Sequence, residues 1–131
     1  MNKIIYFIFA LLICSVSFAD KNMKIGSKGK SSDVTRTIVV KMYDNYYEPN
    51  TFNIKKGETV KFEVKNLGEL VHEFNIANPM MHIKHQPEME LMVENEILLG
   101  DRIDKDKMQK MAAMDKSMGH SHSNSVLLAP K

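Results

Sequence analysis

Short alternating segments between residues 34 and 77 constrain the fold of this chain more than any other feature. In Val34–Met42 and in Thr59–Lys65, apolar residues such as Ile38, Val40 and Phe62 recur at every second position. A period of two residues places these side chains on one face of a half-buried β-strand. Turn-forming residues separate the segments at short intervals, which is typical of an antiparallel sandwich. We therefore predict an all-β fold.

Three further strands are expected at Thr51–Lys55, Val71–Ala77 and 126–128. Gly57 lies in a tight connection where a positive φ is needed, and glycine adopts it at no steric cost. Pro49 lacks an N–H, so it cannot occupy a central ladder position. Five short strands make an incomplete sandwich with an exposed edge and an uncovered apolar face.

The first nineteen residues have the pattern of a secretory signal peptide. Lys3 precedes an apolar run from Ile4 to Cys14, and Ser17-Phe18-Ala19 is a small-x-small ending suited to signal peptidase. An uncleaved anchor and a lipoprotein acylated at Cys14 are the alternatives. We predict export to the periplasm, with no stable membrane insertion after cleavage at residue 19.

Cleavage removes the only cysteine, so the mature chain has no thiol for a disulfide, a nucleophile or a metal ligand. Loss of Lys3 takes the net charge from +2 to +1, which argues against a nucleic-acid-binding protein. Residues 20–33 are polar and rich in Lys, Ser and Gly, the composition of a flexible leader. Residues 34–131 form a single predicted domain.

Residues 78–122 differ from the rest of this domain and are predicted to be a partly helical insertion. They contain eight of the eleven methionines and four of the five histidines. Helix is expected at Glu88–Leu99 and at Asp104–Met118, with Asp104 as the cap and Gly119 as the stop. The stripe of methionines in the second segment is best interpreted as a packing face; it consists of Met108, Met111, Met114 and Met118.

Soft and nitrogen ligands gather at the start of this insertion, at Met80, Met81, His82 and His85. Thioethers prefer Cu(I), whereas imidazoles accept both copper states and zinc, so a copper-binding loop is chemically reasonable. The alternative is that the methionines fill gaps in the core and the histidines lie on the surface. A second pair of imidazoles, His120 and His122, is predicted as an auxiliary metal-binding element.

No pattern of catalytic residues emerges, so we predict a binding protein and not an enzyme. The acidic residues between positions 88 and 104 show no paired spacing and are interpreted as a solvated charged face. Nothing resembles a nucleophile elbow, a catalytic triad or a phosphate loop.

Four short motifs together resemble the N-terminal half of the cupredoxin family, the plastocyanin- and azurin-like blue copper proteins. In sequence order they are Met42-x-Asp44-Asn45-x-Tyr47-x-Pro49, Ile54-Lys55-Lys56-Gly57-Glu58-Thr59-Val60-Lys61-Phe62, Asn66-x-Gly68 and Val71-His72-Glu73-Phe74. The resemblance implies a Greek-key β-sandwich that binds copper in the periplasm, with one-electron transfer in complete members. It also implies that His72 is the first copper ligand.

The sequence departs from the family after residue 78. A blue-copper site needs two imidazoles, a thiolate and a weak axial thioether, and in the family the last three come from a loop between the final strands. Residues 126–131 resemble the segment before that loop, so the chain is expected to be truncated ahead of it. Of the copper ligands that the resemblance implies, only His72 can be assigned to a residue of this sequence.

The leading hypothesis is therefore a periplasmic copper-binding protein, acting in copper homeostasis through sequestration or delivery more than through electron transfer. Its predicted partners are copper ions and a periplasmic redox or copper-transfer protein. The predicted ligands are His72, Met80, Met81, His82, His85, His120 and His122. Alternatives are a metal-free exported interaction module, a non-functional truncated fragment and, with less support, a subunit of a copper oxidase.

Overall fold

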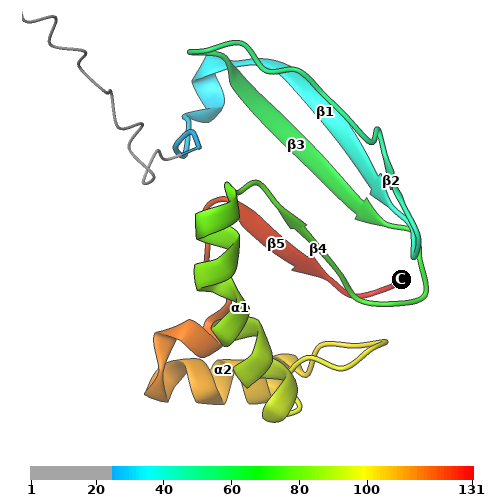
Figure 1. The fold of residues 1–131 in the computed structure, drawn as a ribbon, viewed down its shortest axis with the longest axis vertical. Helices are drawn as coiled ribbons and strands as arrows, with labels where there is room; N and C mark the ends of the chain where they lie inside the picture. Colours follow the sequence, from blue (N-terminus) through cyan, green and yellow to red (C-terminus); the bar gives the residue numbers. More distant parts are fainter. Residues whose placement is uncertain (1–24) are drawn as a thin grey trace, which may run out of the picture.

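The computed structural model describes residues 25–131, so the predicted signal peptide 1–19 and part of the predicted leader lie outside it (Figure 1). The described chain contains five strands, two α-helices and two 3₁₀ helices. In chain order these are η1 (Ser31–Asp33), β1 (Val34–Met42), β2 (Tyr47–Glu48), β3 (Thr59–Asn66), β4 (His72–Asn75), α1 (Pro79–Glu94), α2 (Lys105–Met114), η2 (Lys116–Gly119) and β5 (Ser125–Leu128).

The first sheet has the strand order β2-β1-β3. β1 pairs with β2 in the antiparallel sense, but it pairs with β3 in the parallel sense along almost its full length. The prediction of a purely antiparallel arrangement was therefore wrong. A parallel pair needs a crossover of a dozen or more residues, and residues 43–58 between β1 and β3 provide that length.

The strands predicted at Val34–Met42 and Thr59–Lys65 are confirmed, with Val40 and Met42 buried on the core face. The strand predicted at Thr51–Lys55 was wrong, since that segment is not in a ladder. The carbonyl group of Asn53 in this segment accepts a hydrogen bond from the Arg36 side chain on β1. The following turn is as expected, because Gly57 has a φ of 83°.

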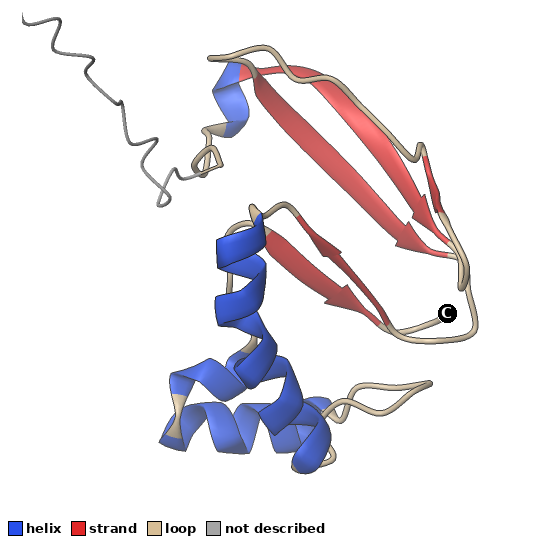
Figure 2. Ribbon diagram, in the orientation of Figure 1, coloured by secondary structure: helices blue, strands red, loops and turns tan. Residues whose placement is uncertain are grey.

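A second sheet pairs β4 with β5 in the antiparallel sense, from His72 opposite Leu128 to Asn75 opposite Ser125. In Figure 2 it lies between the first sheet and the helices. The two sheets meet through tilted aromatic rings, with Phe62 of β3 and Phe74 of β4 having centroids 5.3 Å apart. These are the two layers of the predicted sandwich, while its Greek-key order stays a prediction.

Both helices begin at residues whose side chains cap them. Asn78 accepts a hydrogen bond from the backbone N–H of Met81, and Pro79 occupies the first turn, where its missing N–H costs nothing. α1 therefore begins well before the predicted Glu88. Asp104 caps α2 as predicted, but α2 ends at Met114 and a separate 3₁₀ turn, η2, continues to Gly119.

A methionine-rich core holds the helices together and ties them to β5. Met92, Ile97 and Met118 are its buried residues, and Met89, Leu98, Met108, Met111 and Leu127 pack against them. The packing interpretation of the methionine stripe is confirmed for three members, whereas Met114 is 89% exposed. Within residues 25–131, no helix is long and apolar enough to cross a membrane.

Candidate metal centre

Three separate segments bring three imidazoles and two carboxylates together. β4 contributes one residue, α1 contributes two, and the segment between η2 and β5 contributes two. We call this group the His–Glu cluster; it consists of Glu73, His85, Glu88, His120 and His122. Its potential ligand atoms form two overlapping groups of three that share His85, and within each group all atoms lie within 4.8 Å of one another.

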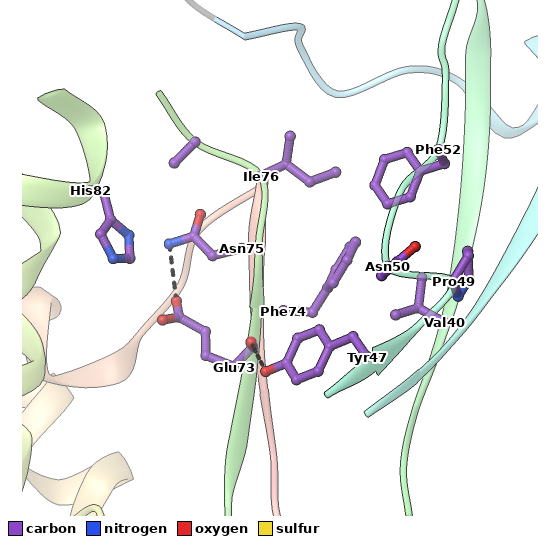
Figure 3. A pocket seen from close by; sticks show the side chains of 11 residues that line it. Val40, Tyr47, Pro49, Asn50, Phe52, Glu73, Phe74, Asn75, Ile76 and His82 are labelled. Atoms are coloured by element: carbon purple, nitrogen blue, oxygen red, sulfur yellow. Dashed lines mark hydrogen bonds between the residues drawn. The ribbon is translucent and has the colours of Figure 1, made fainter. Parts of the chain in front are cut away.

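The regular geometry of β4 and α1 directs three of these side chains toward the cluster. Successive residues of a strand point to opposite faces, so Phe74 turns toward the first sheet while Glu73 turns toward the helices (Figure 3). On α1, residues three and four apart share a face. Met81, His85 and Glu88 follow this spacing, and all three line one pocket beside β5.

His120 reaches the cluster through an uncommon backbone conformation. It follows η2 as its C-cap with a φ of 45° and a ψ of 50°, the left-handed region that few residues other than glycine adopt. Its side chain is only 3% exposed, the most buried in the cluster. Backbone strain of this kind persists where the surroundings hold it and is concentrated at functional sites.

The first of the two groups surrounds Glu73. Its Oε1 lies 2.9 Å from Nε2 of His85 and 3.2 Å from Nε2 of His120, and these two nitrogens are 3.3 Å apart. The hydroxyl of Ser125 donates a hydrogen bond to the same oxygen. These atoms form a compact and largely buried set of potential metal ligands.

The second group surrounds Glu88. Nε2 of His122 lies 2.8 Å from Glu88 Oε2, and Nδ1 of His85 lies 3.4 Å from the same oxygen. The His122 side chain is 37% exposed, against 12% for Glu88 and 10% for His85. This group therefore lies nearer to solvent than the first.

The electrostatic state of Glu73 suits a cation. Burial raises the pKa of its carboxyl group, but hydrogen bonds from His120 and Ser125 and attraction to His85 outweigh burial and lower the pKa to about 2. The carboxylate is therefore charged throughout the neutral range and is enclosed by groups that would themselves bind or contact a metal ion.

The three imidazole rings are mutually close, with centroids 5.0 to 5.3 Å apart for each pair among His85, His120 and His122. A protein that places three imidazoles beside two carboxylates offers the ligands that zinc and cupric ions take. Imidazoles and carboxylates are costly to bury together unless each polar atom has a hydrogen-bond partner or binds a metal ion.

The structure brings together some of the predicted ligands and separates others. His85, His120 and His122 meet in the cluster, and Met81 lines the pocket beside it. Met80 is 39% exposed and outside the cluster. His82 lines a different cleft, of about 460 Å³, between the two sheets (Figure 3).

His72 lies apart from the cluster, against Asp44. Its Nε2 is 2.9 Å from Asp44 Oδ1, and the pKa of Asp44 is held below its usual value chiefly by the backbone N–H of Glu69 and then by His72. Residues 25–131 contain no cysteine. The thiolate-containing ligand set implied by the cupredoxin resemblance is therefore not assembled in this part of the chain.

Sequence reasoning missed the two carboxylates of the cluster. Glu88 was interpreted as part of a solvated face, yet its side chain is 12% exposed between two imidazoles. Its spacing of three residues from His85 on a helix is a signal that could have found it. Glu73 gave no such signal, because its partners are 12 and 47 residues away in the chain.

Two curated proteins are similar to this chain. The Copper-resistant cuproprotein CopI of Pseudomonas aeruginosa is 38% identical over 119 residues, covering 80% of this chain and 61% of that protein. The protein of the same name from Rubrivivax gelatinosus is 32% identical over 74 residues, covering 56% of this chain and 45% of that protein. The chain thus spans about half to three fifths of the length of these relatives.

No solved structure matches this chain significantly. The sequence profile of the cupredoxin-like domain family, in contrast, matches residues 4–103, which include β1 to β4 and α1. The paired sheets described above agree with that match. The chain belongs to the cupredoxin-like family.

Proposed function

We propose that this chain binds copper at the His–Glu cluster and carries it as cargo, in sequestration or delivery in the periplasm. The observation that carries the proposal is the convergence of three imidazoles and two carboxylates from three separate segments. The copper-resistance proteins that resemble the chain support copper as the metal. The predicted signal peptide supports the periplasm.

Binding at the cluster would stabilise the fold. A metal held there joins β4, α1 and the segment before β5, three elements that the unfolded chain does not hold together. A ligand that binds only the folded state raises the free energy of unfolding in proportion to the logarithm of its concentration. The melting temperature is thus a second readout of binding.

A role in holding or passing on copper fits the donor set of the cluster better than rapid electron transfer does. The blue-copper sites of electron carriers depend on a thiolate, and residues 25–131 offer none. The partly exposed His122 gives the cluster an opening through which an ion can enter and leave.

The test is a copper titration of the chain purified from the periplasm, with affinity measured by competition against a chelator. We expect His85→Ala to weaken binding by at least about tenfold, since ligand and near-ligand changes typically cost 10–100-fold. His82→Ala is the matched control, because it removes an exposed histidine of the same helix that faces another cleft. We expect it to bind as the wild type does.

Two results would contradict the proposal. One is that copper neither binds nor raises the melting temperature, which would favour the metal-free interaction module. The other is that His82→Ala weakens binding as strongly as His85→Ala, which would place the copper elsewhere on α1.

A further inference from the structure

Resting on the proposed function, we infer that the His–Glu cluster holds two divalent ions, with the imidazole of His85 lying between them. The two groups of potential ligands share this residue and no other. One group is completed by Glu73 and His120, the other by Glu88 and His122.

The two nitrogens of His85 face different partners. Nε2 lies 2.9 Å from Glu73 Oε1 and 3.3 Å from His120 Nε2, whereas Nδ1 lies 3.4 Å from Glu88 Oε2. The lone pairs of an imidazole diverge within the plane of the ring, so one ion cannot bind both nitrogens. An ion bound at Nε2 leaves Nδ1 with its own donor set around Glu88.

Each half of the cluster offers three ligand atoms to a metal ion. Each contains two imidazole nitrogens, counting His85 in both, and one carboxylate. Three protein ligands with a further position open to water or to a transfer partner is a common arrangement for zinc. Each half also brings one negative charge, so the repulsion between two divalent ions is offset on both sides.

The donor set favours divalent ions over Cu(I). Both groups consist of imidazole nitrogens and carboxylate oxygens, which suit Cu(II) and Zn(II), whereas Cu(I) selects thioethers and thiolates. When both nitrogens of His85 bind metal, its remaining N–H proton passes to water, as expected when metal binding displaces protons from ligands. The resulting imidazolate links the two ions.

The ions in the two halves are expected to exchange with solvent at different rates. The Glu73 half is the more enclosed, with the His120 side chain 3% exposed. The Glu88 half opens to solvent at His122, which is 37% exposed. The outer ion should therefore exchange faster and be removed first by a chelator.

The experiment counts ions with two probes, Zn(II) and Cu(II), added separately to the full chain after removal of bound metal. Native mass spectrometry is expected to show two ions per chain with either probe. With Cu(II), the second equivalent should reduce the electron paramagnetic resonance signal per copper, because an imidazolate bridge couples the two unpaired spins.

Variants then assign each ion. His122→Ala changes the exposed end of the cluster, and we expect one Cu(II) per chain with a full, uncoupled signal. His120→Ala should also leave one ion, held by the outer half, and His85→Ala should abolish the coupling. His82→Ala is again the control and should retain two coupled ions; circular dichroism of the metal-free variants verifies folding.

The outcomes separate this inference from the proposed function. One ion per wild-type chain, or two ions whose signals add without coupling, would overturn the shared His85 while leaving a metal-binding cluster. Loss of all binding in His122→Ala would also overturn it, since a single ion would then use both halves. No binding of either probe to the wild type would overturn the proposed function itself.

Discussion

At the scale of single residues, Glu73 is the side chain on which the cluster depends most directly. Its Oε1 contacts His85 and His120, and Ser125 donates to it. Its carboxylate is negatively charged at neutral pH, and the lowered pKa of about 2 keeps it charged well into the acid range.

Replacing this charge while keeping the shape tests its role directly. We expect Glu73→Gln to lower the copper affinity by about 10–100-fold, the range typical of changes to ligands and their supporting groups, and also to lower the metal-free stability at neutral pH, because the lowered pKa of Glu73 means that its charge stabilises the fold. Glu90→Gln, at an exposed position of α1, is the control. Chelator competition measures both, and equal affinities for Glu73→Gln and the wild type would count against the cluster as the site.

A second prediction at the residue scale concerns the stability of the fold and involves two residues outside the cluster. Arg36 of β1 contacts the carboxylate of Glu58, with Nε 2.6 Å from Oε1. This hydrogen bond, followed by one from the backbone of Lys55, lowers the pKa of Glu58 below its usual value of 4.5. A lowered pKa stabilises the fold above the unfolded-state value, and this contribution is lost as the pH falls through the folded-state value.

We therefore expect Glu58→Gln to melt below the wild type at pH 7, in the presence of a chelator, and the gap to narrow as the pH drops below about 4.5. Glu94→Gln, at an exposed position of α1, controls for the substitution itself. Thermal melts across this pH range measure the gap. A gap that is constant with pH would show that the Arg36–Glu58 pair does not contribute through charge.

Residue patterns alone identified three of the five members of the cluster. His85, His120 and His122 were marked by their chemistry, because histidine is the commonest metal ligand in proteins. Glu73 and Glu88 were not, because whether a carboxylate serves a metal or faces water depends on which distant elements pack beside it. The sequence equally offered no reason to separate His82 from His85, although α1 turns them toward different clefts.

At the scale of elements, local signals predicted the long strands and the capped start of α2 well. Period-two alternation located β1 and β3, and Asp104 marked the start of α2. The parallel pairing of β1 with β3 could not be predicted in this way, because pairing sense depends on how the intervening chain crosses over. The start of α1 was missed although Asn78-Pro79 is a recognisable helix beginning.

The methionines of the helices give an element-scale prediction. Met92 is fully buried in the core of the helical lobe, which consists of α1, α2 and η2, whereas Met114 is 89% exposed. Replacing a buried methionine by alanine costs about 2–5 kcal/mol, from lost burial and the cavity that remains. We expect this loss for Met92→Ala.

Met114→Ala is the matched control, since alanine is also the better helix former at an exposed position. We expect its free energy of unfolding to stay within about 0.5 kcal/mol of the wild type. Urea unfolding of the metal-free proteins measures both. Equal losses for the two variants would mean that the methionine stripe does not pack as described.

At the scale of the whole molecule, the helical lobe inserted between β4 and β5 creates the cluster. The pairing of β4 with β5 brings Ser125, opposite Asn75, within hydrogen-bond reach of Glu73. The helices between these strands (Figure 1) return the chain to them, and His85 and His120 come within ligand distance of Glu73. The motifs before residue 78 indicated the family, and the family is confirmed. They carried no information about the lobe, so the place where its histidines converge was visible only in the fold.

The most direct test of the copper-binding cluster is an anomalous-scattering map from crystals of the chain grown with Cu(II). We predict density bounded by Glu73, His85 and His120, with His122 and Glu88 within ligand distance of the same density or of a second peak beside it. Density confined to His72, or to Met80 and His82, would contradict it.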